Sequence, residues 1–363
     1  MKKSYKKIKT VLVQLLMGLF LGLFLGGFLV SMFELERFGI DIMIYFLIMA
    51  VVAYILQIII HEGGHCLFGL LNGFEFISFR IGSYMWVKDH GKIKFKRYQL
   101  TGTGGQCLME PTQPDLKAYC LYCAGGGICN LLATLIFLIL GLIFGDMLFR
   151  IFCFCMIGLG LLTGLLNLIP IDAEVPNDGY NIYCMLKEKE SVQSIYQQLM
   201  LAKEFADGKR WNEIDGKLFE LYEGADLTNP LNTCIEANKG SRLLALKKYD
   251  EAKECLENLY QKDISMIYRS CVIYDLVLIE LLTSQDINVD KYLDEKMKKQ
   301  MNRDKSDISS LLDQYGIDLL VNKDEEQAKV DLKYFNDACK THPYEGIVED
   351  TKEFVKLLEE RKM

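Results

Sequence analysis

The sequence predicts a mainly α-helical protein, in which a four-helix membrane domain with a small β-sheet insertion precedes an α-helical repeat domain. Three observations predict this arrangement. Four long uncharged apolar stretches occupy the first half of the 363 residues, a short alternating segment interrupts them, and the second half is polar and helical in composition. Because 51% of the residues are hydrophobic, intrinsic disorder is excluded and a wholly soluble protein is disfavoured.

The two halves of the chain differ in charge. Residues 1–179 carry 14 Lys and Arg against 12 Asp and Glu, whereas the remaining residues carry 27 against 36, so the acidic excess lies in the second half. We therefore expect a membrane domain over residues 1–180 and an acidic cytoplasmic domain over residues 181–363. The acidity argues against nucleic acid as a partner.

The uncharged stretches are residues 10–33, 42–60, 118–145 and 151–171. At about 1.5 Å of rise per residue, each is long enough to cross a hydrocarbon core of roughly 30 Å. Buried helices of a soluble core would be an alternative, but four such runs in succession are rare there. We predict four spans of a lipid bilayer, near 10–33, 42–71, 118–145 and 151–171, the first of them an anchor rather than a signal peptide because its apolar run is too long.

Basic residues predict the orientation of these spans, because basic flanks tend to remain on the cytoplasmic side. Five lysines precede the first span, and the 72–117 loop carries seven basic residues. Both the N-terminus and this loop are therefore predicted to be cytoplasmic, and so is the C-terminal half after the fourth span.

A metal-binding pattern lies at the end of the second span, where residues 61–65 read His-Glu-Gly-Gly-His. Positions four apart share one face of a helix, so His61 and His65 can hold one ion while Glu62 projects beside them. A zinc ion bound by neutral imidazoles acidifies water, and a neighbouring carboxylate can carry the proton during peptide hydrolysis. The alternative is a helix end at which these polar side chains only meet the interface, but ionisable groups within a span are expensive and usually functional.

A catalytic zinc ion needs a third protein ligand. His90 lies in an apparent hairpin turn and His342 in the soluble half, so both are poor candidates. Residues 167–180, at the end of the fourth span, contain carboxylates and are predicted to lie on the same side of the membrane as the histidines. A carboxylate there can complete the site, although a segment rich in Pro and Gly could also serve only to end the helix.

Together the two segments resemble the site-2 protease family of intramembrane zinc metalloproteases. That family combines a His-Glu-x-x-His helix with a later Asn-x-x-Pro…Asp-Gly segment, and the resemblance covers roughly residues 40 to 180. It implies that His61, His65 and Asp178 bind zinc, that Glu62 is the general base and that Asn167 helps to hold the substrate or the developing oxyanion.

The resemblance departs from the family in one respect. Seven residues separate Pro170 from Asp178, where the family usually has four. Asp172 is therefore the reserve candidate for the third ligand. Asp178 is preferred because Gly179 follows it, as in the family.

The segment from 74 to 100 alternates in its polarity and predicts a small antiparallel β-sheet, with strands near 74–81, 84–87 and 92–96. One possible role of such a sheet is to cover the cytoplasmic mouth of the site as a lid. Alternatively, its edge can pair with an unwound substrate segment. The Gly-rich residues 102–106 that follow are predicted to be flexible backbone near the opening of the site.

The soluble half contains a faint repeat of 38 residues, in which residues 205–213 align with 243–251, and Leu-Leu pairs recur at 281–282 and 319–320. This spacing favours a tetratricopeptide-like array of helix hairpins, which would bind a protein partner. Chance similarity among amphipathic helices is the alternative.

These patterns predict a zinc-dependent intramembrane endopeptidase, and the family resemblance together with the compact build implies a bacterial plasma membrane. Its substrates would be membrane-spanning proteins or hydrophobic leader peptides, cut near the cytoplasmic face. The alternative function is a catalytically inactive membrane scaffold that recruits proteins through its helical repeats.

Overall fold

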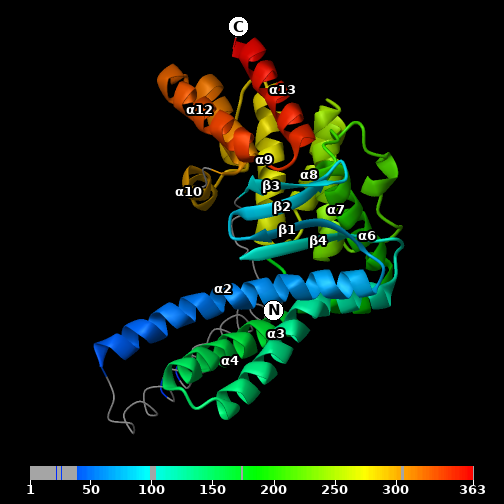
Figure 1. The fold of residues 1–363 in the computed structure, drawn as a ribbon. Helices are drawn as coiled ribbons and strands as arrows, with labels where there is room; N and C mark the ends of the chain where they lie inside the picture. The colour runs from blue at the N-terminus through cyan, green and yellow to red at the C-terminus, as the bar shows by residue number, and fades with distance from the viewer. Residues whose placement is uncertain are drawn as a thin grey trace. The chain divides into compact units, whose positions relative to one another are not determined.

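The computed structural model describes residues 22 and 26 and residues 39–98, 104–172, 175–303 and 306–362. The first predicted span, residues 10–33, lies outside the described residues except at Gly22 and Gly26. The fold is mainly α-helical with one small antiparallel sheet (Figure 1), as predicted. Contacts divide the chain into two compact units, Met1–Asn72 with Lys117–Tyr183 and Gly73–Leu116 with Cys184–Met363.

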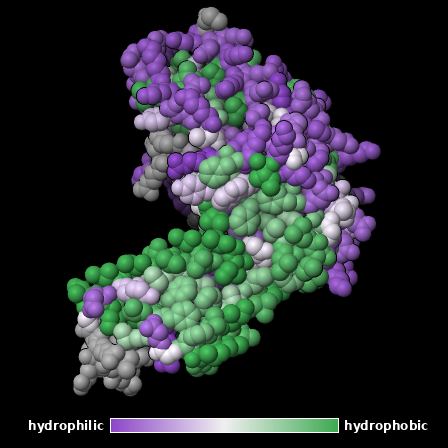
Figure 2. Space-filling model, in the orientation of Figure 1, coloured by the Kyte–Doolittle hydropathy of each residue, from purple (hydrophilic) through white to green (hydrophobic). Residues whose placement is uncertain are grey.

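The first unit contains three helices that are long and apolar enough to cross a membrane, α2 (Ile40–Leu71), α3 (Leu116–Ile143) and α4 (Met147–Leu168). They correspond to the second, third and fourth predicted spans. Many large apolar side chains of α2 and α3 are exposed, and Figure 2 shows hydrophobic residues covering the apolar helices. Exposed apolar surface of this extent is typical of helices that face lipid.

Local sequence sets the ends of these helices. The Asn72 side chain donates to the carbonyl of Phe68 at the last turn of α2, and Gly73 follows with a φ of 78°. Asp146 caps α4 by accepting from the backbone N–H of Phe149. Pro170 follows the end of α4, where a further helical turn would lack a backbone donor.

The second unit begins with a four-stranded antiparallel sheet in the order β3-β2-β1-β4. The strands are β1 (Glu75–Ile81), β2 (Tyr84–Asp89), β3 (Lys92–Arg97) and β4 (Gly105–Glu110). The predicted antiparallel sheet is confirmed, but the prediction for Gly105 and Gln106 is wrong. These residues are not flexible backbone, because they begin β4 and pair with Ile81 and Arg80 of β1.

One face of the sheet packs on the first helix of the C-terminal half, α6 (Val192–Ala206). Ile77, Met85 and Val87 form a buried cluster with Ala206 of α6. The sequence predicts this sheet as an insertion in the membrane domain. In the structure the sheet shares a compact unit with the C-terminal helices.

The remaining helices form the largest core of the protein. Leucines from three of the predicted Leu-Leu pairs, Leu244, Leu281 and Leu319, lie within this core and are buried. Leu244 and Leu281 lie in the last turns of α7 and α9, and Leu319 lies just after α11. Helix α7 packs on α8, and α11 packs on α12. The elements after α4 are α5 (Asp178–Lys187), η1 (Lys189–Ser191), α6, η2 (Gly216–Phe219), α7 (Pro230–Ala245), α8 (Tyr249–Tyr260), α9 (Met266–Thr283), η3 (Val289–Lys291), α10 (Glu295–Arg303), α11 (Ile308–Ile317), η4 (Asp318–Asn322), α12 (Glu325–Thr341) and α13 (Glu345–Lys362).

Candidate metal centre

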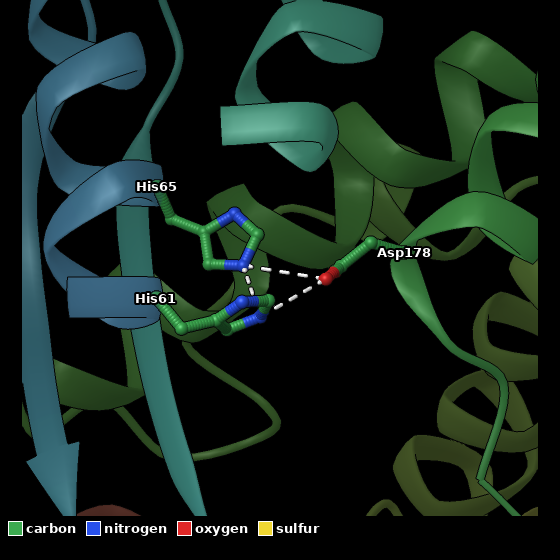
Figure 3. Close-up of side chains that lie close together, drawn as sticks. All are labelled: His61, His65 and Asp178. Carbon is green, nitrogen blue, oxygen red and sulfur yellow. Dashed lines mark hydrogen bonds and ion pairs between the residues drawn. The ribbon is translucent and has the colours of Figure 1, made fainter. Parts of the chain in front are cut away.

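Three side chains that lie far apart in the sequence converge in the first unit. His61 and His65 project from adjacent turns of α2, and Asp178 faces them from the first residue of α5 (Figure 3). Oδ2 of Asp178 lies 3.2 Å from Nε2 of His61 and 3.4 Å from Nε2 of His65, and the two Nε2 atoms are 3.2 Å apart. The predicted convergence of the histidine pair with Asp178 is therefore present.

The other ring nitrogen of each histidine is held by an oxygen atom. Nδ1 of His65 lies 2.8 Å from the backbone carbonyl oxygen of Tyr122, and Nδ1 of His61 lies 2.8 Å from Oδ1 of Asn130. A carbonyl oxygen can only accept, so both Nδ1 atoms carry the proton. In the neutral imidazoles both Nε2 atoms are then unprotonated and present lone pairs.

This arrangement has a direct electrostatic consequence. Two imidazole lone pairs and a carboxylate oxygen point at one small volume, and like partial charges at 3.2 to 3.4 Å repel one another. A cation between them relieves that repulsion. Although burial raises the pKa of the Asp178 carboxyl, an imidazolium beside it lowers that pKa below its ordinary value, so a proton on one ring is the other way to relieve the repulsion.

An amide network buried among the apolar helices holds His61 in place. The Asn130 side-chain nitrogen donates to the backbone carbonyl of Gln57 at 2.8 Å and to Oε1 of Gln57 at 2.6 Å. The Gln57 side chain in turn donates to the carbonyl of Met156 on α4. The backbone carbonyl of Gln57 can only accept, so the atom of Asn130 that faces it must be the amide nitrogen. The amide oxygen, Oδ1, is then the atom that accepts from His61.

Gln57 and Asn130 are functional residues that the sequence prediction does not include, although their positions in apolar helices are a signal. Gln57 lies one helical turn before His61, so Gln57, His61 and His65 share one face of α2. Asn130 lies within the apolar stretch of α3, and both amide side chains have no measurable exposure. Buried polar groups in a membrane span are costly unless they are paired, which could have pointed to both residues.

Close packing of α3 against α2 gives the imidazoles their position. A Cβ atom added at Gly126 of α3 would lie 2.6 Å from Cε1 of His61 and 2.7 Å from Nε2 of His65. Within the motif itself, a Cβ atom at Gly64 would lie 2.3 Å from the carbonyl oxygen of Gly125. Glycine at these positions thus allows the two helices to approach closely enough for α3 to hold both rings.

Asp178 is positioned by its two neighbours in the sequence. The Asn177 side chain donates to the carbonyl oxygen of Ile169 at 2.7 Å and accepts from the backbone N–H of Tyr180 at 2.8 Å, which joins the end of α4 to the start of α5. A Cβ atom at Gly179 would lie 2.3 Å from the carbonyl oxygen of Leu168. Only glycine allows α5 to begin this close to the end of α4.

The other predicted site residues are placed as follows. Glu62 is buried on α2 and follows His61 directly in the sequence. Asn167 lies in the last turn of α4, where its side-chain nitrogen donates to the carbonyl oxygen of Thr163 at 2.9 Å. Asp172, the reserve candidate, is half-buried and does not belong to the group formed by the histidines and Asp178.

Among the described residues, His61, His65 and Asp178 are the group of side chains that can hold a metal ion, since their ligand atoms lie within 4.8 Å of one another. Comparisons of the chain with protein-family models, curated proteins and solved structures found no match.

Proposed function

We propose that this chain is a zinc-dependent intramembrane endopeptidase that hydrolyses peptide bonds of membrane-spanning or hydrophobic leader substrates. One observation carries the proposal. The ligand atoms of His61, His65 and Asp178 lie 3.2 to 3.4 Å apart. Zinc bonds of about 2.0–2.1 Å in tetrahedral geometry require ligand atoms about 3.3–3.4 Å apart.

The donor set supports zinc in a catalytic rather than a structural site. Two imidazoles and one carboxylate are three protein ligands, and a catalytic zinc site keeps the fourth position open. The hydrogen bonds to Asn130 and to the Tyr122 carbonyl fix the ring orientations, as partners of metal-binding histidines commonly do.

A bound zinc ion would supply an electrophile that acidifies water and polarises a peptide carbonyl. The carboxylate of Glu62 takes a proton from the attacking water, whose oxygen forms the new bond to the carbonyl carbon. As the carbon–nitrogen bond breaks, Glu62 returns the proton to the leaving amine. In this proposal Asn167 turns its amide toward the developing oxyanion, as the family resemblance implies.

The position of the histidines along α2 supports cleavage near one membrane face. From Ile40 to His61 the helix rises about 32 Å, which is about the thickness of a hydrocarbon core. In this proposal α2 crosses the bilayer from Ile40, which puts His61 and His65 close to the opposite face. The predicted orientation makes this the cytoplasmic face.

The sheet offers a way to present an extended substrate. In the described sheet β3 has a single neighbour, β2, so its outer edge carries main-chain groups that can pair with another strand. Hydrolysis needs an extended peptide, and strand addition supplies one.

The test compares the wild type with Glu62→Gln, which leaves all three proposed ligands in place. Both proteins are purified, reconstituted and incubated with a solubilised membrane proteome, and new peptide N-termini are identified by mass spectrometry. We expect the wild type to release fragments cut in or near membrane spans, and Glu62→Gln to retain the metal and release none of them. Gly63→Ala is a matched control next to Glu62, because a Cβ atom there would meet nothing within 4 Å.

The alternative, a catalytically inactive scaffold, makes the opposite prediction. If the wild type and Glu62→Gln give the same set of N-termini while the wild type carries its metal, the protease proposal is wrong and a scaffold function is favoured.

A further inference from the structure

The second unit has a partly open cavity of about 80 Å³ among its C-terminal helices. One water molecule needs about 10–15 Å³, so the cavity has room for roughly six groups of that size. Its lining combines the aromatic side chains of Trp211, Tyr274 and Phe354 with the polar side chains of Ser241, Asp275 and Asp313.

Two of the lining carboxyls have no basic partner among the residues that the structure describes. Asp313 is 1% exposed, and its buried Oδ2 atom has no hydrogen-bond partner among the described residues. Asp275 accepts a hydrogen bond from the hydroxyl of Ser241. Within the part of the chain that the structure describes, no ion pair joins either carboxyl to a lysine or arginine. A third lining acid, Asp350, differs because it is paired with Arg210.

Placing these two acids in the cavity lining without a basic partner is costly. A carboxylate withdrawn from water without a counter-charge loses hydration that a hydroxyl partner replaces only in part, so the group either holds a proton or recruits a cation. Burial raises the pKa of Asp275 to about 7, and burial together with the nearby Asp275 raises the pKa of Asp313. A ligand with a positive charge would stabilise both ionised carboxyls.

The remaining walls of the cavity indicate the kind of cation. Trp211, Tyr274 and Phe354 provide aromatic surface, which attracts organic cations and packs well on aliphatic chains. Asp275 and Asp313 do not belong to a group of three close metal ligands, since among the described residues that group is His61, His65 and Asp178. The lining therefore suits a larger cation with spaced donors better than a divalent metal.

We propose that this cavity binds an ammonium or guanidinium group on an aliphatic stem, such as the side chain of lysine or arginine, with the cation at Asp275 and Asp313. The same chemistry is present in a bound peptide and in a free small amine. The cavity lies wholly within the second unit, so the proposal does not depend on the metal centre.

Trp211 provides a direct readout in the full chain. The protein has two tryptophans, Trp86 and Trp211, so Trp86→Phe leaves one reporter, and it lines the cavity. Fluorescence is titrated in detergent solution with Nα-acetyl-lysine amide, Nα-acetyl-arginine amide and butylammonium. Uncharged Nα-acetyl-norleucine amide and calcium chloride at matched ionic strength are the comparison ligands.

We expect a saturable fluorescence change with the organic cations and none with norleucine amide or calcium. Binding only by butylammonium would identify a free amine as the ligand, and binding by the capped amino acids would identify a peptide side chain. Asp313→Asn should weaken binding at least tenfold, and Asp275→Asn is the second variant in case the first does not fold. Asp337→Asn, at an exposed acid paired with Lys340, should leave the affinity unchanged.

Several results would overturn the proposal. Equal binding of norleucine amide would show that the cavity recognises apolar stems alone, and a response to calcium alone would show a metal site. Absence of a saturable change with every organic cation, or unchanged affinity in a folded Asp313→Asn protein, would show that the two acids are merely protonated.

Discussion

Nδ1 of His61 lies 2.8 Å from Oδ1 of Asn130, a residue 69 positions later in the chain. This bond turns Nε2 of His61 toward Asp178, and the bonds from Asn130 to Gln57 hold the amide in the orientation that accepts. The metal centre therefore depends on a polar network that crosses three apolar helices.

Replacing Asn130 tests this dependence. In Asn130→Ala the His61 ring loses its acceptor and its fixed orientation, so we expect the affinity for zinc to fall about 10-fold to 100-fold. The measurement is competition with a chromogenic zinc chelator on purified protein. Asn167→Ala is the control, because the Asn167 side chain bonds within α4, and that variant should bind zinc as tightly as the wild type. Equal affinity in Asn130→Ala would show that His61 is oriented by other contacts.

Two adjacent glycines of the motif should respond differently to the same substitution. In Gly64→Ala the new methyl group would lie 2.3 Å from the backbone carbonyl of Gly125, so α2 and α3 must separate, at a cost of about 1–3 kcal/mol. In Gly63→Ala the methyl group meets nothing within 4 Å, and alanine favours a helix over glycine by about 1 kcal/mol.

Thermal melting in detergent checks this pair of variants. We expect a lower melting temperature and weaker zinc binding for Gly64→Ala, and an equal or higher melting temperature for Gly63→Ala. A similar loss in both variants would contradict the close crossing of α2 and α3.

His342 should make the second unit sensitive to acid. Burial lowers the pKa of His342 to about 4, whereas the unfolded chain titrates near 6.5. Below pH 6.5 the unfolded state binds a proton that the folded state does not, so stability is full above that pH and falls by about 3 kcal/mol as the pH decreases toward 4.

The measurement for His342 is hydrogen exchange of the amides of α12 and α13 between pH 7 and pH 4, corrected for the intrinsic rates. His342→Phe keeps an aromatic ring against Tyr98 and Tyr344 and should remove this part of the pH dependence. The half-buried Asp275 and the buried Asp313 act in the opposite direction and are present in both proteins, so the difference isolates His342. Identical pH profiles would contradict burial of a neutral imidazole.

The apolar helices of the first unit and the histidine pair could be predicted because their signals are local. Long uncharged runs identify α2, α3 and α4, and a spacing of four places His61 and His65 on one helical face. The strand β4 was missed because it begins at a glycine, which hid the alternation of the buried residues Cys107 and Met109.

The rest of the site depends on contacts between distant segments, which sequence spacing does not reveal. Asn130 and Gln57 are uncharged, so a charge-free run of sequence does not distinguish them from their apolar neighbours. The choice of Asp178 over Asp172 rested on a family resemblance. In the structure, the side chain of Asn177 connects the two ends of the intervening segment and brings Asp178 to the histidines.

The most direct test of the metal centre is the zinc content of the purified full chain, measured by elemental mass spectrometry after zinc is added and the excess removed. We predict about one zinc ion per chain in the wild type and in Asp172→Ala, and almost none in His65→Ala or Asp178→Ala. A wild type that binds no zinc, or an Asp178→Ala protein that remains fully loaded, would contradict the convergence of His61, His65 and Asp178 on one ion.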